Sequence, residues 1–496
     1  MKSSDWKAVL RFIGTLLMAE GALMALCLIP AVHFADGTLP HIALCSAVTL
    51  AVGTFLRLRY RRFRDIKDKR MSYLLVVLLW IVLSLFATLP FLATGVTSTL
   101  TPSGPNVIKQ FSYAWFESMS GLSTCGATVF PDVAALPSSI LLWRSMMQWF
   151  GGFGIVLLVL ALTPKLGINK YSLYTAEASG ADNAGGASVR TVVTVRRTLA
   201  VYLGLTLLFI LLLLASGMQA WDAVNLTFTH ISSGGFAPAS DSIASLTPIQ
   251  QYILAATMFF SGINFTLLYL LFTFRWRHMG HKFDELRSFL FLALAAIAFV
   301  VLSLHSRAGL PWADALRLGT VQTVSALTTT GTVVADYTLW PVPVTFLLLM
   351  LAICGGMAGS TSGGLKTMRV LILFRNARAI LRNRLHPSIV NPVRLNGHPI
   401  SGHIANNVMV IFFVFGTSLM LGVMGFMLCG VNPTEAIGAS VGCLTAYGPG
   451  LGPSGGFGCY AHFSSPALWF GSFLMLMGRL ECMTLVILFL PRFWRR

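Results

Sequence analysis

The chain has 496 residues, of which 55% are hydrophobic and 10% are charged, and its mean hydropathy is +0.75. Soluble domains carry about 25% charged residues, so this composition excludes a soluble globular protein and indicates one that crosses a membrane. The formal net charge is +18, from 35 Lys and Arg residues against 17 Asp and Glu residues. A basic balance is also typical of nucleic-acid binding, but here the basic residues lie between the apolar runs, as in cytoplasmic loops of a protein surrounded by membrane lipid. No nucleic-acid partner is therefore expected.

The N-terminal region, residues 1–70, predicts a transmembrane hairpin followed by a basic loop. It opens with basic residues and a long apolar run that lacks a clear small-residue cleavage site, so we expect a retained helix rather than a removed signal peptide. The two expected helices are residues 9–32 and 42–56. The dense basic run at 57–70 is expected to be cytoplasmic, which also places the N-terminus inside the cell.

The rest of the chain divides into four similar units, at residues 71–165, 166–280, 281–398 and 399–496. Each unit has a spanning helix, a shorter semi-apolar helix, a loop rich in Ser, Thr and Gly, and a second spanning helix. Such loops recur at steps of roughly 100 residues, which indicates repeated architecture. The expected spanning helices are residues 72–93, 139–162, 198–215, 248–274, 286–304, 342–354 and onward, 404–428 and 465–490. The expected short helices are residues 106–122, 219–231, 311–328 and 433–444.

The distribution of charge predicts how these units are oriented. If every unit crosses the membrane twice, the basic stretches between units all fall on one face, and the four loops share the opposite face. Lys109, Arg307 and Arg317 are the few basic exceptions on the loop side. This pattern predicts ten spanning helices, both termini in the cytoplasm, and four half-crossing helices that enter from outside.

The four short helices and their loops suggest a cation pathway. Non-helical backbone at membrane depth is tolerated where it is buried in protein or lines a watery cavity. Loops around one axis would present backbone carbonyls, which can replace the hydration shell of a cation. Glycine allows the unusual dihedral angles, and the negative C-terminal ends of the short helices would favour a positive ion.

Taken together, these units resemble the Trk/Ktr/HKT superfamily of potassium transporters, and the additional N-terminal hairpin is similar to the bacterial TrkH type. The segments that carry the resemblance are residues 122–129, 232–236, 328–337, 355–366, 448–452 and 477–481. The resemblance covers almost the whole chain. It implies an all-α integral membrane protein with four pseudo-fourfold membrane–pore-loop–membrane repeats plus the N-terminal two-helix hairpin.

The resemblance also implies a selectivity filter that binds K⁺ mainly through backbone carbonyls. Its residues would be Thr124, Cys125, Gly126, Ser232, Ser233, Gly234, Thr329, Thr330, Gly331, Ala446, Tyr447 and Gly448. The sequence departs from the usual pattern at Cys125, where Thr is common, and at Ala446 and Tyr447, where Asn and an aliphatic residue are usual. Because backbone ligation tolerates side-chain change, we expect conduction to survive, while the choice between potassium and sodium stays open.

A glycine-rich stretch about fifteen residues into the last helix of the third unit is the second candidate site. It lacks the Gly-Lys pair of a Walker loop and follows no strand, which argues against a nucleotide cradle. A flexible linker is the alternative, but it would leave backbone groups unsatisfied in lipid. In the TrkH type the matching loop is an intramembrane gate beneath the filter. Its residues here would be Gly355, Gly356, Gly359, Ser360, Thr361, Gly363, Gly364 and Lys366, the last at the cytoplasmic end.

Arg479 is an ionisable residue in an otherwise apolar helix, which is costly in a membrane and indicates function. We expect it to face the pore, hold the gate loop through its carbonyls and repel cations; a local pair with Glu481 or snorkelling is the alternative. Glu117 is expected to anchor the filter by hydrogen bonds, and Glu20 to be a buried helix–helix contact. His230 is expected to be a packed, hydrogen-bonded histidine rather than a ligand.

The eight cysteines are scattered without metal spacing, and we interpret them as small buried hydrophobic residues. A bridge between Cys429 and Cys459 stays open as an alternative.

Potassium uptake across the bacterial inner membrane is the functional hypothesis, with K⁺ as the transported ion and no other cofactor expected. The resemblance implies a homodimer and a cytoplasmic nucleotide-binding regulatory subunit of TrkA type, for which the basic stretch 369–394 is a plausible docking surface. A secondary transporter for another small solute that uses broken helices is the alternative. An enzyme is not expected, because Asp, His and Glu are too sparse to form a cluster at membrane depth.

Overall fold

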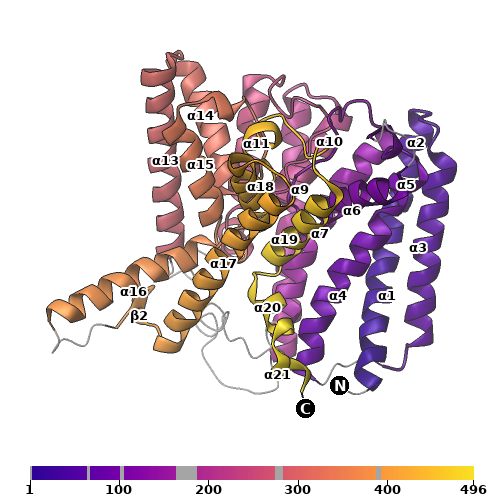
Figure 1. The fold of residues 1–496 in the computed structure, drawn as a ribbon, viewed down its shortest axis with the longest axis horizontal. Helices are drawn as coiled ribbons and strands as arrows, with labels where there is room; N and C mark the ends of the chain where they lie inside the picture. The colour runs from indigo at the N-terminus through magenta and orange to yellow at the C-terminus, as the bar shows by residue number, and fades with distance from the viewer. Residues whose placement is uncertain are drawn as a thin grey trace.

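The computed structural model describes residues 3–63, 68–100, 106–162, 187–273, 283–386 and 392–495. Over these residues the chain is mostly helical, as predicted (Figure 1). The sheet within the described ranges is a hairpin of two-residue strands, β1 (Arg394–Leu395) and β2 (His398–Pro399). The unit boundaries predicted at 165 and 280, with the basic residues around them, lie outside the described residues.

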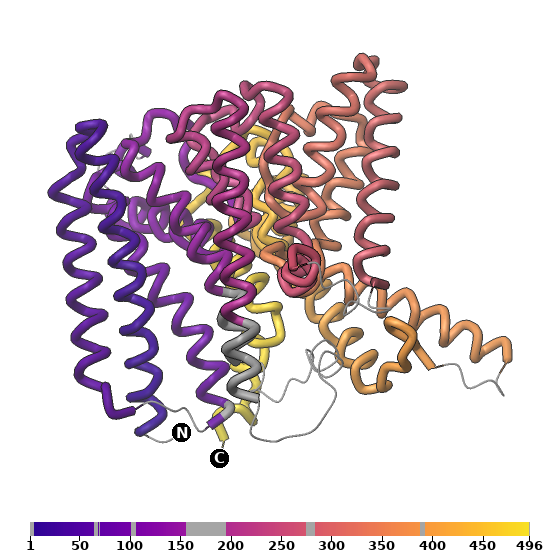
Figure 2. Tube along the Cα trace, turned by 180° about the vertical axis from the view of Figure 1, so that it is seen from behind, coloured from indigo at the N-terminus to yellow at the C-terminus, as the bar shows by residue number. Residues whose placement is uncertain are grey.

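The N-terminal helices form a closely packed hairpin along one flank of the molecule, as Figures 1 and 2 show. Helix α1 (Ser3–Leu26) continues through α2 (Leu28–His33) and packs along α3 (Leu39–Arg59), in agreement with the predicted hairpin. Glycine permits the close approach, because a Cβ on Gly53 would lie 2.7 Å from the backbone nitrogen of Met18. Small residues at such contacts are typical of helices that pack within a membrane.

The connection between α2 and α3 is tied to the rest of the molecule through Asp36. Its carboxylate accepts a hydrogen bond from Thr38 Oγ1 at 2.7 Å and one from the backbone N–H of Ser139 at 2.9 Å. Burial raises the pKa of this carboxyl, but the hydrogen bonds from Thr38 and Ser139 outweigh burial and hold the pKa below its ordinary value of 3.8. The hairpin is therefore anchored to the start of α7 by bonds that depend on the charge of Asp36.

The helices that end in the four loops are interspersed among the other helices of the chain. These other helices are α4 (Lys69–Ala87) with α5 (Leu89–Ala93), α7 (Ser138–Leu162), α9 (Ala187–Ala215), α11 (Pro248–Ser261) with α12 (Phe265–Phe272), α13 (Asp284–Ala308), α15 (Val342–Cys354), α16 (Thr367–Leu385), α17 (Gly402–Leu428), and α19 (Ser465–Arg479) with α20 (Met483–Phe489). The four short helices are α6 (Val107–Ser123), α10 (Ala220–Ile231), α14 (Trp312–Leu327) and α18 (Pro433–Thr445). Minor helical turns are η1 (Ser98–Leu100), η4 (Tyr337–Leu339), η5 (Gly452–Ser454) and α21 (Pro491–Trp494).

Six helices in the described part of the chain are long and apolar enough to cross a membrane. They are Ser4–His33, Leu39–Arg59, Arg70–Ala93, Val195–Ala215, Asp284–Ala308 and Gly402–Leu428. Two bent helix pairs raise this number to as many as eight, and α15 is a shorter apolar helix of 13 residues. The sequence predicts ten spanning helices. Two of the predicted spans are not in this set: α15 ends where the glycine-rich stretch begins, and the side chains of α7 are described only as far as residue 154.

Two helices that the sequence predicts as continuous are broken, so the predictions for 248–274 and 465–490 are wrong in this respect. Helices α11 and α12 meet at 108°, where the Asn264 side chain accepts hydrogen bonds from N–H groups of the first turn of α12 and begins a new helix. Helices α19 and α20 meet at 113°, where Glu481 and Cys482 both have positive φ. Hydropathy gives no sign of the first break, which lies in an apolar run, whereas Arg479 and Glu481 interrupt the apolar run at the second.

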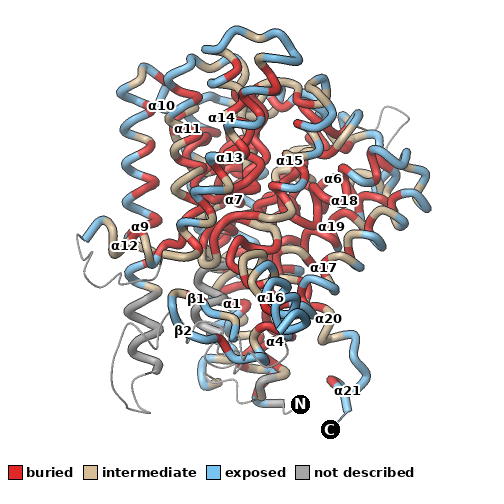
Figure 3. Tube along the Cα trace, turned by 90° about the vertical axis from the view of Figure 1, so that its left-hand side faces the viewer, coloured by how far each residue is buried: buried red, intermediate tan, exposed pale blue. Residues whose placement is uncertain are grey.

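The short helices lie in the interior although they are rich in polar residues. Every residue of α6 from Ser112 to Ser123 is buried, and the last eight residues of α18, from Gly438 to Thr445, are buried as well. Figure 3 shows that buried residues concentrate in the middle of the molecule, while the outer faces of the flanking helices are exposed. A polar helix in such a position needs partners for its side chains and for the loop that follows it.

Candidate functional site

Each short helix ends in a loop with the same backbone conformation. A residue other than glycine with φ between 54° and 56° comes first: Thr124, Ser233, Thr329 and Ala446. Two residues later each loop has a glycine with positive φ: Gly126, Gly235, Gly331 and Gly448. The N–H of the residue between them donates to a carbonyl five residues earlier, at 2.8–3.0 Å, in all four loops: Cys125, Gly234, Thr330 and Tyr447.

This backbone pattern corrects the predicted register of the second loop. The sequence pairs Gly234 with the glycines of the other three loops, but the residue in the corresponding conformation is Gly235. The matching triplet is therefore Ser233, Gly234 and Gly235. Ser232 still belongs to the helix end, since its φ is −83° and its hydroxyl donates to the carbonyl of Phe228 at 2.8 Å. Two adjacent glycines made both registers compatible with the sequence.

The four loops meet in a closed ring that follows the order of the chain. In each loop the positive-φ glycine lies against the carbonyl oxygen of the middle residue of the next loop, and the fourth loop returns to the first. A Cβ on that glycine would lie 2.2 Å from Gly234 O (on Gly126), 1.9 Å from Thr330 O (on Gly235), 1.8 Å from Tyr447 O (on Gly331) and 2.5 Å from Cys125 O (on Gly448). No side chain fits at such distances, so the ring requires glycine at all four positions.

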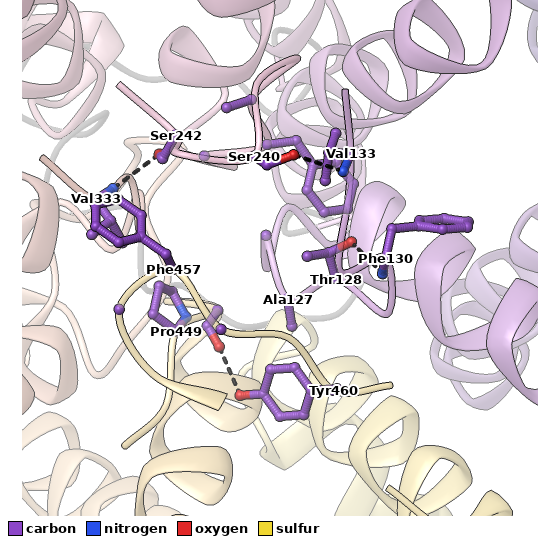
Figure 4. Close-up of a pocket in the computed structure, with 18 of the residues that line it drawn as sticks. Ala127, Thr128, Phe130, Val133, Ser240, Ser242, Val333, Pro449, Phe457 and Tyr460 are labelled. Atoms are coloured by element: carbon purple, nitrogen blue, oxygen red, sulfur yellow. Dashed lines mark hydrogen bonds between the residues drawn. The ribbon is translucent and has the colours of Figure 1, made fainter. Parts of the chain in front are cut away.

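A hollow opens above this ring and is lined by residues from all four loops (Figure 4). Hydrogen bonds join neighbouring loops around it, since Ser240 Oγ accepts from the backbone of Val133 at 3.0 Å and Ser242 Oγ accepts from Val333 at 3.1 Å. Among the described residues that line it there is no Asp or Glu, and the one cationic side chain is Arg144. Any cation at the ring would therefore meet backbone carbonyls rather than carboxylates.

Glu117 braces the first loop from behind. It accepts a hydrogen bond from the backbone N–H of Val129 at 2.9 Å and forms an ion pair with Arg144 at 2.8 Å. Arg144 also donates to Thr128 Oγ1 at 3.2 Å. Both charged side chains are at most 2% exposed, and a buried pair of this kind needs such additional hydrogen bonds to be stable.

Two other residues singled out in the sequence, His230 and Glu20, are buried. His230 is buried, with Nδ1 2.6 Å from Leu226 O and Nε2 3.1 Å from Thr332 Oγ1, which agrees with a packed histidine. Glu20 is fully buried in α1, and its carboxyl has no hydrogen-bond partner among the described residues. The structure thus places Glu20 in the helix interface as expected, without a polar contact.

Cys429 and Cys459 are both free, so no bridge joins them.

The glycine-rich stretch at 355–366 is a compact loop that packs against the loops of the ring. Three of the four loops bond to it: Ser233 Oγ is 2.8 Å from Thr361 Oγ1, Gly363 N–H donates to Thr329 Oγ1 at 2.6 Å, and Gly364 N–H donates to Thr445 O at 3.0 Å. The loop is therefore in direct contact with the residues that shape the ring.

Glycine and hydroxyl groups hold this loop together. Gly355, Gly359 and Gly364 have positive φ, and a Cβ on Gly356 would lie 2.2 Å from Ser362 Oγ. Ser360 Oγ donates to Met357 O at 2.6 Å. A linker without structure would not make these contacts.

The break between α11 and α12 supplies the other wall of the loop. The Asn264 amide donates to Ala358 O at 2.5 Å, and the N–H of Met357 donates to Gly262 O at 2.9 Å. The N–H of Ala358 donates to Glu285 Oε1 of α13 at 2.6 Å. The bend in this helix thus exposes backbone groups that the loop satisfies.

Two cationic side chains hold the same loop. Lys366 is buried and donates to Ser362 O. The guanidinium of Arg479 donates to Thr361 O at 3.1 Å and to Gly151 O at 3.0 Å. Glu481 pairs instead with Arg369, so the alternative of a local pair between Arg479 and Glu481 is wrong.

Comparison with known proteins shows the family to which the chain is related. The sequence profile of TrkH, described as a cation transport protein, matches residues 39–496. The chain belongs to the TrkH family. It is 32% identical over 493 residues to the Trk system potassium uptake protein TrkH of Halomonas elongata and 33% identical over 493 residues to that of Salmonella typhimurium, with 99% of each chain covered.

A solved structure supports the same relationship. The potassium transporter TrkH from Vibrio parahaemolyticus matches with a TM-score of 0.87 and 29% sequence identity, over 99% of this chain and 100% of that one. The predicted TrkH resemblance is thus confirmed, and with it the assignment as a mostly helical, multi-pass membrane protein.

Arg144 and Gln148 are among the residues that sequence reasoning missed and that contact the loops of this TrkH family member. Arg144 and Gln148 both lie on α7, and they are buried. They are four residues apart and so lie on one face of the helix. Arg479 was singled out because a polar or charged group in a spanning helix is costly and indicates function. The same reasoning applies to Arg144 and Gln148, and it could have identified them from the sequence.

Proposed function

We propose that this chain mediates potassium uptake across the bacterial inner membrane, with the ions passing through the ring of loop carbonyls. The observation that carries the proposal is the closed ring formed by the carbonyl oxygens of Cys125, Gly234, Thr330 and Tyr447 against the glycines of neighbouring loops. Rings of backbone carbonyls replace the water around potassium in known filters. Both relatives named above are Trk system potassium uptake proteins, and their names support potassium as the transported cation.

Electrostatics at the ring favours a cation. The C-terminal ends of α6, α10, α14 and α18 lead into the four loops, and a helix carries about half a negative charge at that end. The described lining of the hollow lacks carboxylates, so the attraction comes from peptide dipoles. An anion would be repelled by the same arrangement.

The loop at 355–366 would act as the gate beneath the filter. Its support is the set of hydrogen bonds to Ser233, Thr329 and Thr445, with Arg479 holding the carbonyl of Thr361. For an ion to pass, the loop must move away and at least some of these bonds must break. Arg479 would both hold the closed position and repel cations.

The exposed arginines of α16 offer a docking surface for a cytoplasmic regulatory subunit of the nucleotide-binding TrkA type. Helix α16 extends sideways from the body of the molecule (Figure 1). Arg369 and Arg375 form internal ion pairs, whereas Arg378, Arg382 and Arg384 are exposed. A homodimer with both termini in the cytoplasm belongs to the same proposal.

Flux measurements test the proposed function. Purified protein in liposomes should accumulate rubidium when an outward potassium gradient is imposed. Expression should also restore growth at low potassium to bacteria that lack potassium uptake systems. The matched variant is Gly331→Ala, whose Cβ would lie 1.8 Å from Tyr447 O. Wild-type protein that is inserted, supplied with its regulator and still inactive for potassium would refute the proposal.

The alternative, a carrier for another solute, draws on the two broken helix pairs, a feature typical of secondary transporters. A solute flux in the same liposomes that persists without any alkali cation would favour it.

A further inference from the structure

One filter loop has no side chain at its middle position. Cys125, Thr330 and Tyr447 occupy that position in the first, third and fourth loops, whereas the second loop has Gly234. The φ of Gly234 lies outside the left-handed region, so the backbone itself does not require glycine there. Something other than conformation must explain why this position is empty.

The space is filled by the side chain of Gln148, which reaches in from α7. A Cβ on Gly234 would lie 2.4 Å from Gln148 Cδ and 2.5 Å from its Oε1. Gln148 is fully buried, its Nε2 donates to Gly234 O at 2.8 Å, and its Oε1 accepts from the N–H of Phe236 at 3.1 Å. The amide thus bridges the backbone on both sides of the positive-φ glycine, Gly235.

The first and third loops are braced differently, by a side chain of their own short helix. Glu117 accepts from the N–H of Val129, and Gln322 accepts from the N–H of Val334 at 3.2 Å. Each lies nine residues before the ring glycine of its loop, and the corresponding residue of the second loop is Leu226, which has no polar group. The second loop therefore depends on a brace from another part of the chain.

We propose that Gln148 is the positioning residue of the second filter loop, and that by holding the Gly234 carbonyl oxygen in the ring it sets the discrimination between potassium and sodium. This inference rests on the proposed function. Gly234 O is one of four ring carbonyls and is the one that receives a hydrogen bond from a glutamine amide. Losing that donor frees the carbonyl to rotate, and losing the acceptor leaves the buried N–H of Phe236 without its partner.

The test compares two variants of Gln148 with a matched glutamine. Gln148→Met keeps the length of the side chain and removes both hydrogen bonds, whereas Gln148→Glu keeps the acceptor for Phe236 and removes the donor. Gln251 is the control, because it is also fully buried and its amide donates to the carbonyl of Ile243 at 2.9 Å, outside the ring. The measured quantity is the ratio of potassium to sodium flux in liposomes.

We expect Gln148→Met to lower this ratio by about fivefold, because the loss of one hydrogen bond that favours potassium over sodium changes their relative flux by about that factor. Gln148→Glu should lower it as well, and Gln251→Met should leave it unchanged. A wild-type ratio in folded, conducting Gln148→Met overturns the inference and leaves the proposed function intact. Absence of alkali-cation flux in the wild type overturns both.

A second pair of variants covers the case in which Gln148→Met fails to fold. Gly234→Ala alone should impair flux, because its Cβ meets the Gln148 amide. Adding Gln148→Ala should restore part of the flux, since it removes the obstructing group, but the ratio of potassium to sodium should stay low. If the double variant is no better than Gly234→Ala, or has the wild-type ratio, the positioning role is wrong.

Discussion

Replacing Gly235 by alanine tests the ring most directly. The added Cβ would lie 1.9 Å from Thr330 O, and an ordinary contact needs at least 3.4 Å, so that carbonyl must retreat by about 1.5 Å. In addition, φ of +75° costs an alanine about 1–2 kcal/mol. A 1 Å misplacement of a group that acts on a bound reactant costs about 100-fold in rate, and we expect a loss of this size in potassium flux.

The matched control is Gly217→Ala, because Gly217 has φ of +84° and open space around its Cβ position. It bears the same backbone cost without the collision, so its flux per folded protein should equal that of the wild type. The assay is rubidium uptake into liposomes, normalised to the protein recovered as a single peak in size-exclusion chromatography. Wild-type flux in folded Gly235→Ala would refute both the ring and the corrected register of the second loop.

Three further outcomes are expected. Arg479→Ala removes two hydrogen bonds, including the one to Thr361 O, and should raise rubidium flux in liposomes; unchanged flux would remove Arg479 from the gate. Arg144→Met leaves the buried Glu117 carboxylate without its ion-pair partner and should destabilise the protein by about 3–5 kcal/mol. The double variant Arg144→Met with Glu117→Gln should be destabilised less, as measured by thermal unfolding in detergent. Equal melting temperatures of the two variants would contradict the ion-pair argument. The lowered pKa of Asp36 stabilises the fold above about pH 4, and this contribution is lost as the pH falls through the folded pKa. The melting temperature of Asp36→Asn should therefore lie below that of the wild type at about pH 6, and the difference should shrink as the pH is lowered through the folded pKa.

The sequence was sufficient for the helical class, the N-terminal hairpin and the four loops, because these depend on hydropathy and on glycine. The bends in α11–α12 and α19–α20 were not predicted, because no proline marks either one. Arg479 and Glu481 interrupt the apolar run at the second bend, but charged residues alone do not specify a bend. The bends depend instead on local polar contacts, such as the Asn264 side chain that begins α12.

The second loop shows the same limit within the site. Gly234 and Gly235 are interchangeable in a sequence pattern, and the difference between them lies in which one meets Thr330 O and which one meets Gln148. That difference is set by a helix about 86 residues away in the chain. Contacts at such separation are a property of the packed molecule and leave no local periodicity.

The ring is built by a single polypeptide, and its four middle residues are all different: Cys125, Gly234, Thr330 and Tyr447. In an assembly of identical subunits, one codon change appears at every position around the axis at once. Here each change alters one quarter of the circle. Evolution can therefore adjust this ring in small, separate steps, and laboratory libraries can do the same, one loop at a time.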